Sequence, residues 1–255
     1  MTSTILKHKA PKLHPILSLP GVNEIITLVR AIRGPVMRIL KPRSRYFLFT
    51  PPNRDLKPMS TSYGFDRGKP VDRYYIEQFM KDHEKDVRGV CLEVTDRDYT
   101  KKYGGIKVTR SDILDINTGN KQATIYGDLQ KIPQIKDNTY DCFILTQTLM
   151  MIDDYEAAIR ESKRILKPGG VLLATISTMS PVWNIEHHMW RFTGASGRYI
   201  FGKYFDKDKY DVKTYGNALA GQAFWVGMAV QDLSPNELAY NDPHFPITVA
   251  VRAVK

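Results

Sequence analysis

Residues 139–176, TYDCFILTQTLMMIDDYEAAIRESKRILKPGGVLLATI, carry the pattern that decides the fold. The run Cys142–Leu145 is apolar without interruption, which is typical of a strand covered on both faces of a parallel sheet. Over 153–167 the apolar residues recur at steps of three and four, as on one face of a helix. Pro-Gly-Gly at 168–170 ends that helix, and Val171–Ile176 is a second apolar run. The pattern therefore predicts a right-handed crossover between two parallel strands.

The rest of the chain continues this alternation of strands and helices. The patterns predict strands at 87–94, 106–109 and 123–126, helices near 72–82 and 218–230, and a last strand at 247–254. Together they predict an α/β fold, with a Rossmann-like, doubly wound and mostly parallel sheet that has helices on both faces. Ligands of such sheets bind beyond the carboxyl ends of the strands, where the strand order reverses.

Charge divides the chain into two parts. Residues 1–60 hold eleven Lys or Arg against Glu24 and Asp55, a net charge of +9 out of +10 for the 255 residues. Apolar residues within 22–32 fall on one helical face, so we expect a basic, helical N-terminal extension and linker over 1–60, followed by one domain over 61–255. A basic arm favours an anionic neighbour, such as lipid head groups, a phosphorylated carrier or nucleic acid. A solubilising tail, or docking of the arm on the protein's own core, is the plainer alternative.

Composition narrows the class of protein further. The two cysteines, Cys91 and Cys142, lie in predicted buried strands, which favours a reducing compartment and leaves no four-ligand zinc site. No apolar run approaches the length of a membrane span, and lysines and a proline interrupt the N-terminal apolar residues that a secretory signal would need. We expect a cytoplasmic protein, with peripheral contact to an anionic membrane through residues 1–60 as an option.

Carboxylates follow successive strands of the predicted sheet. Glu93 ends the first strand, Asp112 comes nineteen residues later, just past the second, with Asp115 as its nearby competitor, and Asp128 follows the third. A carboxylate at the second position can accept both hydroxyls of a ribose, and one at the third can accept an exocyclic amine. Each acid alone is more simply a helix cap or a turn residue. Their joint placement favours a nucleoside-like ligand.

At this point the chain resembles the class I S-adenosylmethionine-dependent methyltransferases, especially the methyltransferase type 11 group and related enzymes of bacterial polysaccharide gene clusters. The resemblance covers about residues 60–255 and rests on the segments DRGKPVDRYYIE at 66–77, LEV at 92–94, GDL at 127–129, YDC at 140–142, RILKPGG at 164–170 and YGN at 215–217. The cofactor would be S-adenosylmethionine. The RILKPGG segment indicates the fold and says little about the acceptor.

The resemblance also implies roles for individual residues. Glu93 would lie in the cofactor loop, Asp112 would hold the ribose, Asp128 and Leu129 the adenine, and Thr146 and Gln147 would border the methionine portion. The glycine-rich loop that the family carries after the first strand is missing, because Thr95, Arg97 and Tyr99 stand in its place. Asp96 and Tyr99 would then build a different wall, with Tyr63 and Arg67 closing over the cofactor's carboxylate.

Transfer of a methyl group to a hydroxyl is helped by a base that removes the proton. His187 and His188 follow the fifth strand and are candidates, although a surface or packing role is as consistent with the sequence, and neither ring is preferred. Residues 180–215 are rich in aromatics and, by the resemblance, form a lid-like insertion over the acceptor.

The sequence therefore predicts a methyltransferase acting on a small molecule or a glycan. A binding or scaffold protein that kept the fold without the activity is the first alternative, suggested by the missing glycines. A nucleic-acid methyltransferase is the second, and it is disfavoured because no aromatic residue is interleaved with the basic ones before Tyr46.

Overall fold

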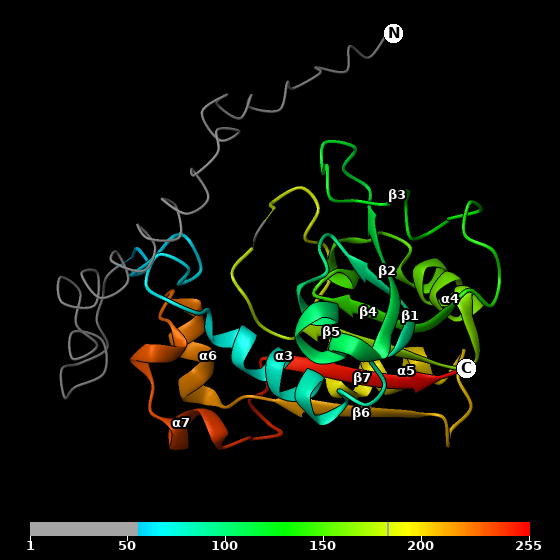
Figure 1. Ribbon diagram of the computed structural model, residues 1–255. Helices are drawn as coiled ribbons and strands as arrows, with labels where there is room; N and C mark the ends of the chain where they lie inside the picture. The colour runs from blue at the N-terminus through cyan, green and yellow to red at the C-terminus, as the bar shows by residue number, and fades with distance from the viewer. Residues whose placement is uncertain (1–55, 183) are drawn as a thin grey trace, which may run out of the picture.

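The computed structural model describes residues 56–182 and 184–255. The expected helical face at 22–32 and most of the basic extension lie outside these residues. Within the described part the chain forms a seven-stranded sheet in the order β3-β2-β1-β4-β5-β7-β6 (Figure 1). The first five strands of that order run parallel, and β7 is antiparallel to both β5 and β6. The expected doubly wound, mostly parallel sheet is confirmed.

The elements follow one another closely along the chain. The strands are β1 Gly89–Val94, β2 Val108–Asp115, β3 Ile125–Tyr126, β4 Tyr140–Thr146, β5 Leu166–Ser177, β6 Tyr210–Tyr215 and β7 Thr248–Val254. The α-helices are α3 Val71–Asp82, α4 Tyr155–Ile165, α5 Gly194–Phe201, α6 Ala218–Trp225 and α7 Pro235–Ala239. None of the described helices is both long and apolar enough to cross a membrane.

The crossover predicted from residues 139–176 is present as β4, α4 and β5. Asp154 caps α4, because its side chain accepts a hydrogen bond of 2.8 Å from the backbone N–H of Ala157. The helix ends at Ile165, and β5 begins at Leu166. A side chain at Gly170 would place its Cβ 2.8 Å from the carbonyl oxygen of Tyr140, so only glycine allows the chain to re-enter the sheet so closely.

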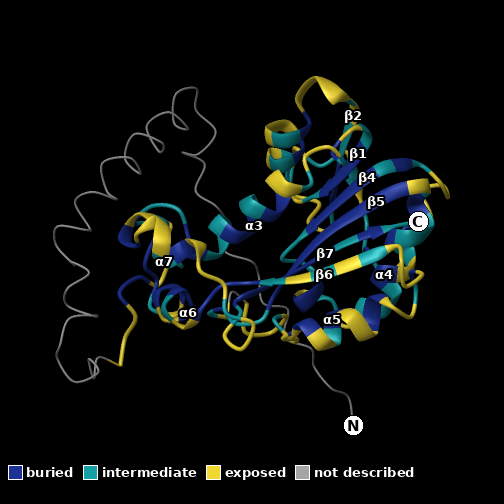
Figure 2. Cartoon of the chain, turned by 90° about the horizontal axis from the view of Figure 1, so that it is seen from below, coloured by how far each residue is buried: buried dark blue, intermediate teal, exposed yellow. Residues whose placement is uncertain are grey.

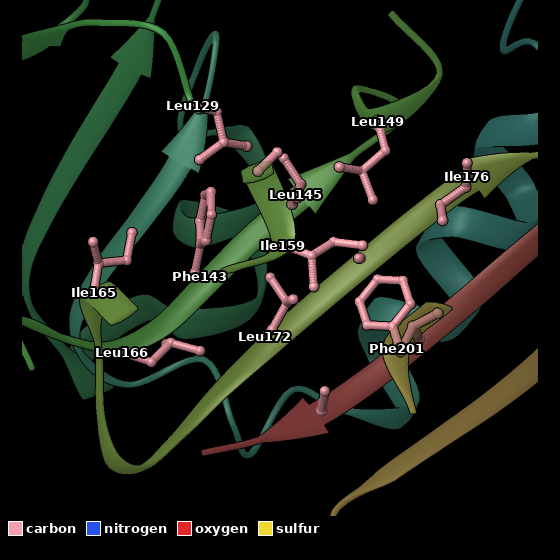
Figure 3. Packing of buried hydrophobic residues seen from close by; sticks show 14 of the residues in the cluster. Leu129, Phe143, Leu145, Leu149, Ile159, Ile165, Leu166, Leu172, Ile176 and Phe201 are labelled. Atoms are coloured by element: carbon pink, nitrogen blue, oxygen red, sulfur yellow. The ribbon is translucent and has the colours of Figure 1, made fainter. Parts of the chain in front are cut away.

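Helices cover both faces of the sheet, as expected. One buried cluster joins α4 and α5 to β4 and β5, with Ile159, Phe201, Phe143 and Leu172 among its members (Figure 3). A second cluster packs α3, α6 and α7 on the opposite face. The central strands β4, β5 and β7 are therefore buried almost throughout, whereas β6 at the edge alternates with exposed residues (Figure 2).

Some helices and strands differ from the sequence-based expectation. The second strand was expected at 106–109 but spans Val108–Asp115. The polar residues in its middle interrupt the apolar pattern, because the strand lies near the sheet edge and its outer neighbour β3 is only two residues long. The edge strand β6 was not predicted, since its alternating residues carry no long apolar run. The helix expected at 218–230 ends at Trp225. The expected insertion at 180–215 contains α5, which packs on the sheet, and β6, which is a strand of the sheet. Residues 180–193 precede these two elements.

Candidate functional site

A cavity of about 550 Å³ opens beyond the carboxyl ends of β1 to β5. The chain proceeds from β1 outward to β2 and β3 and then returns to β4 beside β1, so the cavity lies where the strand order reverses. Its wall consists of Tyr63, Phe65, Pro70, Asp72, Arg73, Val94–Asp96, Tyr99, Leu114–Ile116, Gly127–Gln130, Thr146–Thr148, Met150–Ile152, Ser180, Pro181, His188 and Phe224. Five strand ends and the segment before α3 thus contribute to one site.

Most of the residues singled out from the sequence belong to this wall. They are Tyr63, Asp96, Tyr99, Asp128, Leu129, Thr146, Gln147 and His188. The roles expected of them toward a cofactor or an acceptor stay predictions. Four further candidates, Glu93, Arg67, Asp112 and His187, do not line the cavity.

Asp112 was expected just past the second strand, and this placement is wrong. The residue lies inside β2, where its side chain accepts a hydrogen bond of 2.9 Å from the Tyr140 hydroxyl and pairs with Arg110 at 3.1 Å. The strand continues to Asp115, which lines the cavity. The error follows from the misplaced end of the strand, because the last strand residue, and not one in its middle, faces the ligand site.

Arg67 is also placed differently from the expectation. Its side chain is fully buried, and its Nε and Nη2 each donate a hydrogen bond of 3.0 Å to Asp232. A guanidinium engaged in this way ties the segment before α3 to residues near α7, so its role is structural. His187 is exposed and outside the cavity wall, whereas His188 lines it.

The loop after β1 keeps its conformation without glycines. The buried Glu93 carboxylate accepts hydrogen bonds from the backbone N–H of Tyr99 (3.1 Å), from that of Thr100 (2.8 Å) and from the Thr100 hydroxyl (2.7 Å). Thr95 adopts a φ of 71°, a left-handed conformation that glycine usually provides. Glu93 thus supports the loop after β1 from behind the cavity wall, and its expected role toward the cofactor stays a prediction.

Glu93 makes stability depend on pH. Burial raises the pKa of Glu93 to about 7, whereas an unfolded glutamate titrates near 4.3. The folded protein therefore binds this proton more tightly, and the contribution of Glu93 to the free energy of unfolding is fully present below about pH 4 and lost as pH rises to about 7. In urea unfolding between pH 4.5 and 8, wild type should lose about 3 kcal/mol relative to Glu93→Gln as pH rises. Parallel pH profiles of the two proteins would contradict this prediction.

Charge is distributed unevenly within the cavity. Four carboxylates line it, those of Asp72, Asp96, Asp115 and Asp128, whereas Arg73 is the only Lys or Arg among the described residues of the wall. The Arg73 Nη1 donates a hydrogen bond of 3.0 Å to the Tyr99 hydroxyl. Burial raises the pKa of Asp72, against the opposing effect of Arg73 beside it. The cavity thus suits a ligand with cationic groups and a single carboxylate.

Asp115 and Asp128 stand at the ends of neighbouring strands. The Asp115 carboxylate accepts hydrogen bonds from the Asn117 N–H (2.8 Å) and the Asn120 amide (2.7 Å). The Asp128 carboxylate accepts from the backbone N–H and the side-chain amide of Gln130, at 2.9 and 3.0 Å. Both carboxylates are therefore held in place at the wall, and each oxygen retains capacity for a further hydrogen bond.

Two residues of the cavity wall each have a buried polar atom with no hydrogen-bond partner among the described residues. These are the buried Nε2 of Gln147, whose backbone φ is 50°, and the buried Nδ1 of His188. The other ring nitrogen of His188 contacts Arg191. Burial and the nearby Arg191 lower the pKa of His188, which favours its neutral ring.

Sequence reasoning missed Asp72 and Arg73 as site residues. Both belong to the segment before and within the first turn of α3, which the sequence marks by its density of charged and aromatic residues. That signal identifies the segment, but it does not show which of its two arginines, Arg67 or Arg73, faces the cavity. Among the described residues, no cluster of His, Cys, Asp or Glu side chains is arranged to hold a metal ion.

Comparisons with known proteins show that the chain is similar to methyltransferases. The model of a methyltransferase domain matches residues 86–174. The demethylmenaquinone methyltransferase of Staphylococcus aureus is 32% identical over 85 residues, which are 33% of this chain and 34% of that protein. The chain thus matches about a third of the length of these curated relatives.

The structure of an S-adenosylmethionine dependent methyltransferase from Mesorhizobium loti aligns with a TM-score of 0.50 and 14% identity over 72% of this chain and 100% of that one. At this identity the likeness shows the fold. Residues 86–174 are therefore similar to a methyltransferase domain, and the chain has the class I methyltransferase fold, as the sequence indicates. The resemblance to enzymes of polysaccharide gene clusters stays a prediction.

Proposed function

We propose that the protein is a methyltransferase that binds S-adenosylmethionine in the cavity and methylates a small-molecule or glycan acceptor. One observation carries the proposal: carboxylates at the ends of two neighbouring strands and the cavity's single arginine line the same hollow at the switch point of the sheet. This set of donors and acceptors fits a nucleoside joined to an amino acid. The match to a methyltransferase domain supports the same interpretation.

The residues of the wall suggest how such a cofactor would be held. Asp128 and Leu129 would hold the adenine, and Asp115 would accept the hydroxyls of the ribose in place of Asp112. Arg73, positioned by Tyr99, would bind the carboxylate, a contact for which a guanidinium is well suited. Thr146 and Gln147, at the end of β4, would border the methionine portion.

The chemistry asked of the protein is then mainly orientation. The bound cofactor supplies an activated methyl group, and an in-line displacement requires that the acceptor atom be held against it. His188 lines the cavity and His187 is exposed outside its wall, so His188 is the candidate base, and its Nε2 would have to release Arg191 in order to take the proton of an acceptor hydroxyl.

Calorimetry with S-adenosylhomocysteine tests the proposal. Wild type should bind, and Arg73→Met should weaken binding about 10- to 100-fold, because a charge-assisted pair with a carboxylate is lost. Lys69→Met is the matched control, since Lys69 lies just before α3, outside the cavity wall, and pairs with Glu77 at 2.6 Å. Absence of binding by wild type at millimolar cofactor would refute the enzymatic function and favour the non-catalytic scaffold.

A polyanion such as a nucleic acid is disfavoured as the ligand because four carboxylates line the cavity.

A further inference from the structure

The charged groups of the cavity wall are gathered on one side of it. Three carboxylates follow β1, β2 and β3, which are neighbours in one half of the sheet, and they belong to Asp96, Asp115 and Asp128. Arg73 and the preceding Asp72 belong to the same side, because the Arg73 Nη1 donates a hydrogen bond of 3.0 Å to the Tyr99 hydroxyl in the loop after β1. The segments after β4 and β5 contribute no carboxylate, lysine or arginine to the described part of the wall.

Hydrogen bonds join the segments that form the uncharged side. The Trp190 indole, in the segment after β5, donates 2.8 Å to the carbonyl oxygen of Ile152, in the segment after β4. The Tyr63 hydroxyl, in the segment before α3, donates 2.9 Å to the carbonyl oxygen of Val182. Three segments that are far apart in the sequence therefore meet at this side of the cavity.

Apolar and aromatic side chains form most of the uncharged side. Phe224 of α6 is attached to it through the backbone, because Met59 N–H, four residues before Tyr63, donates 2.8 Å to the Val226 carbonyl just after α6. We call the following wall residues the apolar end: Tyr63, Phe65, Met150–Ile152, Pro181 and Phe224. Side chains of this kind favour a flat, apolar ligand, which loses its contact with water when it packs against them.

Polar groups beside the apolar end are few, and two hydroxyls are already engaged. The Tyr63 hydroxyl is bound to the segment after β5, and the Thr148 hydroxyl donates 2.9 Å to the Thr146 carbonyl. Ser180 and His188 are the polar side chains that the segment after β5 adds to the wall. A sugar carries a hydroxyl on most of its carbons, and each hydroxyl that is buried without a partner costs free energy. The apolar end therefore fits a glycan poorly.

A negatively charged acceptor fits the apolar end no better. Four carboxylates line the cavity, and Arg73, the single arginine or lysine in the described wall, lies on the charged side. A carboxylate or phosphate at the apolar end would lose its hydration without gaining a cationic partner. An uncharged acceptor avoids this cost.

We propose that the acceptor is an uncharged, largely apolar small molecule with a nucleophilic hydroxyl, and that it binds at the apolar end. This inference rests on the proposed function, because it assigns the charged side of the cavity to the cofactor and leaves the apolar end to the acceptor. The segment after β5 also carries His188, the candidate base. Of the two acceptor classes, a small molecule and a glycan, the glycan is the poorer fit.

Calorimetry of the full chain with three probe molecules tests this acceptor class. The compound 2-naphthol is apolar and neutral at pH 7, 2-naphthoate has the same rings and a negative charge, and methyl glucoside represents a glycan. With S-adenosylhomocysteine bound, 2-naphthol should bind about tenfold more tightly than either of the others, or better, since it alone buries apolar surface without unpaired charge or several unpaired hydroxyls. Equal or tighter binding of methyl glucoside or 2-naphthoate would overturn the proposal, and so would the absence of 2-naphthol binding at millimolar concentration.

Substitutions at the apolar end show whether 2-naphthol binds there. Phe65→Ser should weaken its binding about tenfold, because an aromatic contact is lost, and Met151→Ser should weaken it by a smaller factor. Phe65 and Met151 are 48% and 38% exposed, so both variants should fold. The matched control is Phe245→Ser, since Phe245 is 56% exposed and lies outside the cavity wall, and it should bind 2-naphthol as wild type does. Wild-type affinity in both Phe65→Ser and Met151→Ser would overturn the proposal.

The acceptor class and the proposed function can fail separately. If 2-naphthol binds, Phe65→Ser weakens that binding and S-adenosylhomocysteine does not bind, the apolar end is a binding site and the methyltransferase function is refuted. If S-adenosylhomocysteine binds and methyl glucoside binds more tightly than 2-naphthol, the methyltransferase function stands and the apolar acceptor is refuted.

Discussion

Replacing Asp115 with Ala should weaken binding of S-adenosylhomocysteine about 100-fold, because two hydrogen bonds from ribose hydroxyls to a charged acceptor would be lost. Asp112→Ala is the matched control, since Asp112 lies three residues earlier on the same strand and contacts Tyr140 and Arg110 instead of the cavity. It should bind the cofactor as wild type does. Isothermal titration calorimetry on both variants measures the difference.

A disturbed loop would lower the cofactor affinity of Asp115→Ala in the same way as a lost contact with the ligand. The Asp115 carboxylate accepts a hydrogen bond of 2.7 Å from Asn120, so its removal also loosens the turn after β2. Asn120→Ala removes that bond and keeps the carboxylate. Cofactor affinity that falls as far in Asn120→Ala as in Asp115→Ala would show that Asp115 acts through the turn. An equal loss in Asp112→Ala would refute the assignment of the ribose contact to Asp115.

Arg67→Ala should lower the free energy of unfolding by about 3–5 kcal/mol, the largest effect on stability that we expect. Both members of the pair are buried, and Asp232 would keep its charge without the two hydrogen bonds of 3.0 Å that Arg67 donates. Lys69→Ala is the control, because the Lys69–Glu77 pair is partly exposed and should contribute less than about 1 kcal/mol. Urea unfolding monitored by circular dichroism gives both values.

A double variant tests whether the charge or the packing carries this effect. Arg67→Met with Asp232→Leu removes both charges, so it should be more stable than Arg67→Ala alone. Below its unfolding transition, Arg67→Ala should still bind the cofactor, in contrast to Arg73→Met. If Arg67→Ala unfolds like wild type but loses affinity, Arg67 contacts the ligand after all.

The loop after β1 shows why a missing motif is weak evidence against a site. Glycines are favoured there because the backbone must adopt unusual conformations close to the ligand. In this chain Thr95 takes the left-handed conformation, and Glu93 holds the residues that follow through three hydrogen bonds. A buried carboxylate thus holds this loop without glycines, and Thr95, Asp96 and Tyr99 of the loop line the cavity.

The sequence by itself determined the central strands and the crossover between them. Long apolar runs define the central strands β4 and β5 because these are buried on both faces, and the period of α4 is set by one buried side. It also placed Asp128, Thr146 and Gln147 at the ligand edge, since each follows or ends a strand whose boundary is clear.

Only the tertiary structure decided which polar residues face the cavity. Periodicity is weak in β2 and β6, near the sheet edges, so the end of β2 and with it the choice of Asp115 over Asp112 required the register of β1 against β2. The choice of Arg73 over Arg67 depended on Asp232, which lies 165 residues further along the chain from Arg67. Contacts between residues so distant in sequence leave no local pattern, because a side chain's direction is set by its partner in the folded protein.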